Sequence, residues 1–393
     1  MQEQKKISVL FISRWYPYPG DPMLGLFVQR HAEAVSKYCK VNSLFAYPVD
    51  DQKSKFSILT NLHEEIEEIL ISYRRGKCLI HFLNPLINVI RHLKALNIGY
   101  KYLRKTQDKP DISHVNILTR TGIFALYLKL RFGIPYVITE HWSRYLSSNP
   151  SYTGFLRKLA TKITVSNAAA VSTVSTILQK AMKNTGLSCK HWEIIPNVVS
   201  DDFFKAEILS KQNEIAQIVH ISCFEDVSKN ISGILRSIAM LKKKRNDFKL
   251  TLVGDGIDFE NIKKLASELE LDQNDIAFTG VLLKQDLIKQ LQKSDFFVLF
   301  SNYETFAVVI PESLALGIPV IGSRAGAIPE VLPTNAGIVI DKGNENQLCE
   351  AMSKMIDTHH NYDSNQLRSL VKNKYSEEAV GKQFLRLYIE IIN

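Results

Sequence analysis

The sequence has few cysteines, and none of them forms a recognisable pair. Its five cysteines are odd in number, widely scattered and never spaced as C-x-x-C. This spacing argues against a disulfide framework and against a structural zinc site, and it favours a reducing, cytoplasmic compartment. The cysteines are Cys39, Cys78, Cys189, Cys223 and Cys349.

Long apolar runs are also missing. The longest candidate, residues 78–90, is interrupted by His81, Asn84 and Asn88. The apolar run at residues 7–12 is too short for the core of a secretion signal. Because a membrane-spanning helix needs about 18 apolar residues in a row, we expect no such segment.

The net positive charge of the chain lies in its first half. Residues 1–198 hold 27 Lys and Arg against 13 Asp and Glu, a net charge of +14, whereas residues 199–393 have a net charge of −5. A basic half can contact an anionic membrane, and residues 73–109 form a basic, amphipathic segment suited to that role. Ordinary solubilising lysines explain the charge equally well. Basic and aromatic residues do not alternate as in nucleic-acid-binding motifs, so we expect no nucleic-acid partner.

The most informative stretch runs from residue 297 to residue 321. An apolar run rich in aromatic and β-branched residues is followed by polar Ser-Asn-Tyr-Glu, a segment with helical periodicity, and a second β-branched run. We predict a strand, a loop, a helix and a strand. Ligands of open parallel sheets bind outside the carboxyl ends of the strands, so residues 301–306 are a candidate site.

Two acids, Glu304 and Glu312, border this predicted helix. Pro311 is best tolerated in a first helical turn, which places Glu312 near the helix N-terminus. Carboxylate oxygens suit the neighbouring hydroxyls of a sugar, and free amides at the helix start suit phosphate or sugar oxygens. Those amides belong to Thr305, Phe306 and Ala307. Glutamates at helix starts are also commonly just solvated.

The neighbouring sequence distinguishes these two interpretations. Glu304 and Glu312 are followed by Gly-Ile-Pro-Val-Ile at 317–321 and Gly-Ala-Ile-Pro-Glu-Val at 326–331. This series resembles the E-x7-E motif of glycosyltransferase family 4, whose members are retaining enzymes that use nucleoside diphosphate sugars. The resemblance implies an α/β protein of the GT-B fold, with two Rossmann-like parallel-sheet domains facing across a cleft and a C-terminal helix that crosses back to the first domain.

The domain boundaries follow from the same resemblance. The Ile-Pro-Asn-Val run at 195–198 looks like the interdomain crossing of this family. We therefore predict an acceptor-side domain at 1–197, a nucleotide-sugar-binding domain at 198–375 and a C-terminal helix at 376–393. The apolar stripe of that helix is predicted to comprise Ala379, Phe384, Leu387 and Ile391.

Three residues are predicted to be catalytic. His141 ends a predicted strand and resembles the histidine that family members place beside the donor sugar. Lys229 matches the family's diphosphate-binding lysine, and Glu304 is the first acid of the motif. Cys223 stands where family members usually carry an arginine. Arg14, Arg324 or the helix N-terminus could supply the missing contact.

The remaining predicted contacts bind the donor. Glu312, Thr305, Phe306 and Ala307 belong to the central stretch, and Ala307 replaces a glycine common in the family, which would narrow the space near the hexose. The turn after the strand at 276–280 resembles the segment that touches the nucleotide base. Its residues are Val281 and Leu282. The Gly- and Pro-rich loop after the first strand supplies Gly25 and Arg14.

No cofactor is expected. The chain has no Asp-x-Asp, the usual carboxylate pair for a diphosphate-bound metal ion, so we expect metal-independent activity. A Gly-x-Gly turn follows the strand at 250–253, but Phe259 occupies the position of the third glycine of a dinucleotide motif.

Together these features predict a retaining glycosyltransferase. It would move a hexose from a UDP- or GDP-sugar to a hydroxyl of a glycan or lipid-linked acceptor, in bacterial cell-surface polysaccharide synthesis. The expected location is the cytoplasm, including the inner face of the membrane. The alternatives are a non-catalytic nucleotide-sugar-binding or scaffolding protein and a GT-B epimerase.

Two further expectations concern structure alone. The acidic run at 64–68 is predicted to lie on a solvated helical face. His114, inside a predicted strand, is expected to be a structural residue.

Overall fold

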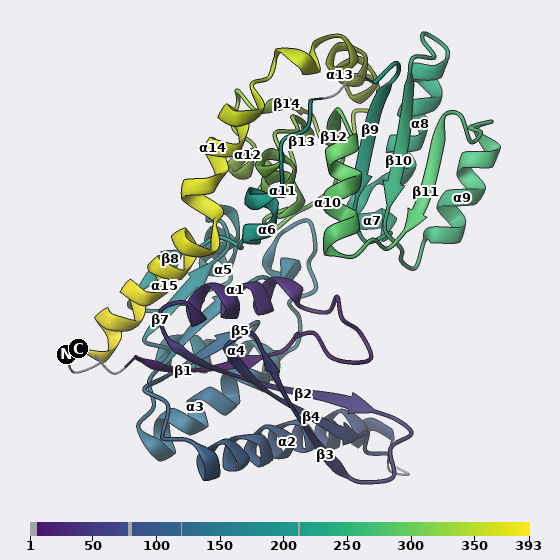
Figure 1. Cartoon of the computed structure of the whole chain (residues 1–393). Helices are drawn as coiled ribbons and strands as arrows, with labels where there is room; N and C mark the ends of the chain where they lie inside the picture. Colours follow the sequence, from purple (N-terminus) through teal and green to yellow (C-terminus); the bar gives the residue numbers. More distant parts are fainter. Residues whose placement is uncertain (1–5, 78–80, 119, 211–212) are drawn as a thin grey trace. The chain divides into compact units, whose positions relative to one another are not determined.

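The computed structural model describes residues 6–77, 81–118, 120–210 and 213–393 (Figure 1). The chain divides into two compact units. The first unit comprises Met1–Val198 and Glu377–Asn393, and the second comprises Val199–Ser376. Cys78 lies outside the described residues, and the four described cysteines are free thiols.

The first unit is built on an eight-stranded sheet in the order β3-β4-β2-β1-β5-β6-β7-β8. Every neighbouring pair is parallel except β3 and β4. The strands are β1 Ser8–Ser13, β2 Lys40–Val49, β3 Phe56–His63, β4 Ile66–Arg74, β5 Ile112–Asn116, β6 Tyr136–Glu140, β7 Ala170–Thr173 and β8 Trp192–Ile194. Their short apolar runs are typical of parallel strands covered on both faces.

Helices supply the parallel crossovers of this sheet. They are α1 Leu26–Ser36, α2 Asn84–Thr106, α3 Arg120–Phe132, α4 Phe155–Asn167 and α5 Thr176–Asn184, with short 3-10 turns η1 His81–Leu83 and η2 Ser143–Tyr145. Helix α15 Glu377–Ile392 also belongs to this unit, but it follows the second unit in the chain and connects no strands of the sheet. Figure 1 shows α2 and α3 on one side of the sheet and α1 on the other. Helix α2 packs closely because a Cβ atom at Gly99 would lie 2.4 Å from Leu44 Cδ1.

The C-terminal helix α15 packs on α1 in the first unit. Phe384 and Leu387 are buried as predicted, but Val380 and Tyr388 complete the buried stripe in place of Ala379 and Ile391. His114 fixes this helix to the sheet, because Nδ1 lies 2.6 Å from Tyr388 Oη and Nε2 lies 2.6 Å from Thr139 Oγ1. His114 is therefore a buried structural residue.

The second unit contains a six-stranded, fully parallel sheet in the order β11-β10-β9-β12-β13-β14. Its strands are β9 Ala216–Ile221, β10 Phe248–Val253, β11 Ile276–Gly280, β12 Phe296–Leu299, β13 Val320–Ser323 and β14 Gly337–Ile340. Its helices are α6 Asp201–Lys205, α7 Asp226–Lys229, α8 Ile231–Lys242, α9 Phe259–Glu268, α10 Lys284–Lys293, α11 Val309–Ala315, α12 Ile328–Val331, α13 Glu345–Thr358 and α14 Ser364–Tyr375, with a 3-10 turn η3 His359–Asn361. The predicted class, two parallel-sheet α/β domains, is confirmed.

None of the described helices is both long and apolar enough to cross a membrane.

The helical prediction for the acidic run at 64–68 is wrong. The run forms the turn of the β3–β4 hairpin and the first residues of β4. Glu64 occupies the turn with φ 52°, and Glu65 is exposed. The same segment continues into β4, which pairs with β2 and is largely buried. This long-range strand pairing overrides the local charge pattern.

Glu68 is the residue of this run that differs most from the prediction, because it is 4% exposed. Its Oε1 accepts hydrogen bonds from Tyr16 Oη at 2.8 Å and Gln29 Nε2 at 3.0 Å. Its Oε2 accepts one from Asn61 Nδ2 at 3.0 Å. The carboxylate thus joins β4 to β3, to α1 and to the loop after β1.

Replacing Glu68 with Ala should lower the free energy of unfolding by about 2 to 3 kcal/mol, because the buried Tyr16 hydroxyl and Gln29 amide would lose their acceptor. Urea unfolding followed by circular dichroism measures this change. The exposed Glu65→Ala in the same acidic run is the control and should stay within about 0.5 kcal/mol of wild type. Equal stability of the two variants would contradict the structural role of Glu68.

Candidate functional site

The candidate site of the second unit lies at the carboxyl ends of β9 and β12. These two strands are neighbours, and the sheet order reverses between them, since β9 leads to β10 on one side and β12 leads to β13 on the other. Such a switch point is where open parallel sheets bind ligands. Lys229 follows β9 and Glu304 follows β12, so the fold brings these two predicted residues together.

Lys229 and Glu304 form an ion pair, with 2.5 Å between Lys229 Nζ and Glu304 Oε1. The side chains are 19% and 10% exposed. Ser301 Oγ also donates to Glu304 Oε1, at 2.9 Å. Within the described residues Glu304 Oε2 accepts no hydrogen bond, so it is the carboxylate oxygen available to a ligand hydroxyl.

The charge of Lys229 is stabilised by its surroundings. Burial by itself would lower the pKa of Lys229, but the Glu304 carboxylate and Cys223 outweigh it and raise that pKa. Lys229 therefore remains a cation at neutral pH. Cys223, at the position expected to hold an arginine, is exposed.

Close packing holds the Glu304 backbone in place. Gly326 has φ 54°, and a Cβ atom there would lie 2.0 Å from the Glu304 carbonyl oxygen. The same oxygen accepts a hydrogen bond from Ala327 N at 3.0 Å. Ser323 Oγ donates to Ser301 O at 2.6 Å and fixes the start of the loop. Sequence reasoning quoted Gly326 as part of a motif and included Ser301 in the candidate loop, but it did not predict these contacts.

Helix α11 starts at Val309, and Glu312 lies in its first turn as predicted. The amides of Thr305, Phe306 and Ala307 were predicted to lie at the helix start, but they belong to the loop. Ala307 has φ 65°, the left-handed conformation that glycine adopts without strain. This conformation is the physical reason to expect a glycine here, as the resemblance in the sequence implies.

The other predicted donor contacts differ in accessibility. Glu312 lies in α11 and is 2% exposed. Phe306 is also 2% exposed, and its ring packs against Tyr375 at 5.5 Å between centroids. Val281 is 50% exposed and Leu282 is half-buried, directly after β11. Arg324 is exposed and lies 3.5 Å from Asp341.

His141 belongs to the first unit and directly follows β6. It is 5% exposed, and its Nε2 lies 3.4 Å from Asn116 Oδ1. Its ring packs beside Phe27 at 4.7 Å and His31 at 5.3 Å between centroids. Burial lowers the pKa of His141 well below its usual value, and His31 and His114 lower it further, while Asn197 acts in the opposite direction. The imidazole is therefore neutral, the form that can hydrogen-bond a hydroxyl.

The loop after β1 contains Gly25 and Arg14. Gly25 has φ 69° and precedes α1, and a Cβ atom there would lie 2.4 Å from the carbonyl carbon of Trp15. Glycine is therefore required at this position by chain packing. Arg14 is half-buried, and burial lowers its pKa. The nearby positive charges of Arg120 and Arg144 lower that pKa further. These two arginines were not predicted from sequence, although each follows a predicted strand.

Glu140 is another residue that sequence reasoning missed. It is fully buried at the end of β6 and accepts hydrogen bonds from Leu118 N at 3.0 Å, His141 N at 2.9 Å and Trp142 N at 3.0 Å. Burial raises the pKa of Glu140, and Arg144 with these amides opposes the change. This carboxylate holds the loops after β5 and β6 together and so positions His141.

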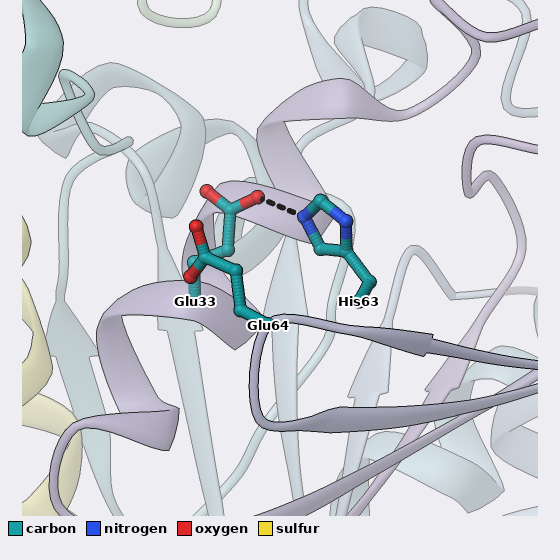
Figure 2. A group of neighbouring side chains, drawn as sticks. All are labelled: Glu33, His63 and Glu64. Atoms are coloured by element: carbon teal, nitrogen blue, oxygen red, sulfur yellow. Dashed lines mark hydrogen bonds and ion pairs between the residues drawn. The ribbon is translucent and has the colours of Figure 1, made fainter.

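One group of side chains in the first unit has the composition of a metal site. Glu33 on α1 meets His63 and Glu64 at the β3–β4 turn, with ligand atoms within 4.8 Å of one another (Figure 2). His63 Nε2 lies 2.8 Å from Glu33 Oε1. That contact fixes the tip of the hairpin to α1. Because exposed acids often gather without an ion, the group does not decide whether the protein uses a metal.

Comparison with known families identifies the chain. The model for "Glycosyl transferases group 1" matches residues 201–376, and the model for "Glycosyltransferase Family 4" matches residues 56–203. The chain belongs to glycosyltransferase family 4. It is a transferase enzyme, and the predicted family and enzyme class are confirmed.

Two curated relatives illustrate the family. N-acetyl-alpha-D-glucosaminyl L-malate synthase of Bacillus anthracis is 27% identical over 298 residues, covering 72% of this chain and 75% of the relative. N-acetylgalactosamine-N,N'-diacetylbacillosaminyl-diphospho-undecaprenol 4-alpha-N-acetylgalactosaminyltransferase of Campylobacter jejuni is 25% identical over 328 residues, covering 79% of this chain and 84% of the relative.

Solved structures show the same fold. Sucrose-phosphate synthase of Thermosynechococcus elongatus aligns with a TM-score of 0.78 at 18% identity, covering 98% of this chain and 99% of that one. Anabaena HepE in complex with UDP aligns with a TM-score of 0.72 at 16% identity, covering 98% and 100%. The glycosyltransferase thus has the GT-B fold.

Replacing Ala307 with Gly should stabilise the glycosyltransferase by about 0.5 to 1 kcal/mol. Glycine relieves a backbone strain of about 1 to 2 kcal/mol in the left-handed conformation, which stabilises the fold. It also increases the entropy of the unfolded chain, which costs about 0.5 to 1 kcal/mol. Urea unfolding measures the difference. Ala315→Gly, within α11, is the matched control and should lower stability. The strain argument is wrong if Ala307→Gly is destabilised to the same extent.

Proposed function

We propose that this glycosyltransferase transfers a hexose, with retention of anomeric configuration, from a UDP- or GDP-sugar to a hydroxyl of a glycan or lipid-linked acceptor. The observation that carries the proposal is the Lys229–Glu304 pair at the switch point between β9 and β12. A buried cation and a carboxylate with one available oxygen are the two groups that a sugar diphosphate requires.

The proposed chemistry depends on the leaving group. The bond between the sugar's anomeric carbon and the diphosphate oxygen breaks, and a bond from that carbon to the acceptor oxygen forms while the hydroxyl proton is lost. Negative charge develops on the departing diphosphate, and a preorganised cation stabilises it. Lys229 fills that role because its ammonium is already charged and fixed.

The other predicted residues of the second unit complete the donor site in this proposal. Glu304 Oε2 and Glu312 accept hydrogen bonds from sugar or ribose hydroxyls. The loop amides of Thr305, Phe306 and Ala307 face the donor, and Val281 and Leu282 border the base. In the first unit, neutral His141 hydrogen-bonds a sugar hydroxyl, and Gly25 allows the loop after β1 to approach a ligand closely. We assign no carboxylate as a nucleophile, and we propose that the reaction needs no metal ion.

The names of the relatives support this range of substrates. The Bacillus anthracis relative is by name a synthase of N-acetyl-alpha-D-glucosaminyl L-malate, and the Campylobacter jejuni relative is by name a transferase for a diphospho-undecaprenol substrate. Anabaena HepE was solved with UDP and with UDP-glucose. We propose bacterial cell-surface polysaccharide synthesis at the cytoplasmic face of the membrane as the setting. A non-catalytic nucleotide-sugar-binding protein or a GT-B epimerase would bind the same donor without transferring its sugar.

Calorimetric titration of UDP and GDP, with a metal chelator present, tests the donor site. We expect one nucleotide to bind wild type, and Glu312→Ala to lose about 1 to 3 kcal/mol of binding free energy through lost charge-assisted hydrogen bonds. Glu350→Ala changes an exposed acid on α13 of the same unit and should bind like wild type. The donor-site proposal fails if neither nucleotide binds, or if both variants match wild type.

We further propose that the first unit contacts an anionic membrane through α4. The outward side of this helix exposes four large apolar residues beside its basic ones: Phe155 and Leu156 are each 78% exposed, and Leu159 and Ile163 are each 44% exposed. Its buried side holds Thr161, Thr164 and Val165. Exposed apolar residues gathered in this way are typical of an interaction surface.

Charge favours an anionic membrane as that partner. Helix α4 carries Arg157, Lys158 and Lys162, and neither α4 nor the adjacent α3 contains an acid. Leu130, 77% exposed, extends the apolar surface on α3. Each basic residue near such a surface contributes about 1 kcal/mol. The sequence pointed to residues 73–109, whereas α4 has the more exposed apolar face.

Flotation with phosphatidylglycerol vesicles tests this contact. Wild type should float with these vesicles and not with phosphatidylcholine vesicles, and the double substitution Phe155→Ser with Leu156→Ser should abolish flotation. Ile257→Ser removes an apolar residue that is 84% exposed in the second unit and serves as the control. Flotation that is unchanged in the double variant, or equal on both lipids, would exclude α4 as the contact.

A further inference from the structure

A cluster of basic side chains gathers at the carboxyl edge of the sheet in the first unit. Arg14 directly follows β1, Tyr73 is next to the last residue of β4, and Arg120 opens α3 after β5. Arg144 lies in η2 after β6, and His92 lies on α2. The four strands are parallel, so their carboxyl ends share one edge. We call Arg14, Tyr73, His92, Arg120 and Arg144 the arginine cluster.

The cluster surrounds the switch point of this sheet. The strand order reverses between β1 and β5, because β1 leads to β2 on one side while β5 leads to β6 on the other. The loops after β1 and β5 meet there, with Arg14 N donating to Asn116 O at 3.1 Å. A switch point is the ligand-binding position of a parallel sheet.

The members of the cluster lie close together. The Tyr73 and His92 rings lie 5.8 Å apart between centroids. Burial raises the pKa of Tyr73, and the nearby Arg120 and Arg14 oppose that change. Burial lowers the pKa of His92 to about 3, and both Arg14 and Arg120 contribute to that change. His92 is therefore neutral, and the positive charge of the cluster belongs to its arginines.

These charges are not balanced by acids in the part of the chain that the structure describes. Arg144 is partly offset by Glu140, but neither Arg14 nor Arg120 forms an ion pair with a described carboxylate. His92 is 0% exposed, and neither of its ring nitrogens has a hydrogen-bond partner. The buried Arg144 Nε also has none. Like charges and unpartnered buried donors are costly to fold, and a bound anion removes that cost.

The loop beneath the cluster is held rigidly. Ile117, which is fully buried, has φ 67°, a strained conformation for a β-branched residue. Arg144 Nη2 donates to Leu118 O, and Leu118 N donates to Glu140. Strained backbone of this kind is common at ligand sites, where the surrounding contacts offset its energetic cost.

We propose that the arginine cluster binds an oxyanion group, a phosphate or a carboxylate, of the acceptor substrate. This proposal rests on the proposed function and names the class of acceptor. Two guanidinium groups without acid partners match a doubly charged anion, and each can bind oxygens through two parallel N–H bonds. Arg14 and Arg120 are half-buried, so an entering ligand can reach them.

An acceptor fits the cluster better than the donor does. In the proposed function Lys229 already supplies the cation for the donor diphosphate. The cluster supplies three further arginines, which follow β1, β5 and β6, beside Tyr73 of β4. The earlier expectation that Arg14 contacts the donor phosphate then becomes the competing outcome of the test.

Calorimetry with inorganic pyrophosphate and with malonate tests the inference on the full-length protein, saturated with the nucleotide that binds it. We expect one probe to bind, and the tighter of the two to identify phosphate or carboxylate as the preferred group. Arg120→Gln and Arg14→Gln should each weaken that probe at least tenfold. Lys101→Gln, an exposed basic residue on α2, is the control and should not change its affinity.

Arginine labelling of the wild type gives a second readout that needs no variant. Bound probe should protect Arg14 and Arg120 from phenylglyoxal, as mass spectrometry of the labelled peptides would show. The inference is overturned if neither probe binds, if saturating nucleotide blocks the probe, or if the arginine variants bind it like Lys101→Gln. Nucleotide binding, titrated separately, tests the proposed function, so a protein that binds nucleotide but neither probe refutes this inference alone.

Discussion

In a parallel sheet every strand ends at the same carboxyl edge. The loops that follow neighbouring strands therefore meet at that edge, even when they are far apart in the sequence. This constraint builds both sites of the glycosyltransferase. In the second unit Lys229 and Glu304 are separated by 75 residues along the chain but follow adjacent strands. In the first unit Arg14 and Asn116 meet in the same way after β1 and β5. Each meeting point is where the order of the strands reverses.

The two edges treat buried charge differently. The second unit balances its cation, because Glu304 compensates the cost of burying Lys229. The first unit keeps His31 and His141 neutral, as burial lowers the pKa of His31 to about 4 and that of His141 well below its usual value. It leaves Arg14 and Arg120 without described acid partners. A balanced pair suits a ligand that brings both charge and hydroxyls, whereas an excess of arginine suits an anion.

Both edges also contain residues in left-handed backbone conformations. Ala307 follows the motif loop of the second unit, and Ile117 follows β5 in the first. Neither is a glycine, so each stores conformational strain next to a proposed site. Gly326 also has a left-handed backbone, but as a glycine it stores no such strain. The absence of a side chain lets the Glu304 backbone approach closely. The loops are thus held by packing and not by regular secondary structure.

Local pattern in the sequence determined the class of fold and the family. Apolar runs that alternate with amphipathic segments identified strands and helices, and the spacing of Glu304, Glu312 and the following Gly-Ile-Pro run identified glycosyltransferase family 4. These features depend on neighbours along the chain, so they are visible without a structure. The roles of the individual site residues remain predictions.

Tertiary structure decided what depends on contacts between distant residues. The sequence predicted a solvated helix at 64–68, but pairing with β2 made it a strand and buried Glu68. It placed the amides of Thr305, Phe306 and Ala307 at a helix start, but Ala307 is left-handed and the helix begins at Val309. It did not show that Glu304 forms an ion pair with Lys229, or that Arg14, Arg120 and Arg144 lie at the same edge of the first sheet. Such pairings are set by strand order, and a parallel sheet fixes that order through crossovers that no local pattern encodes.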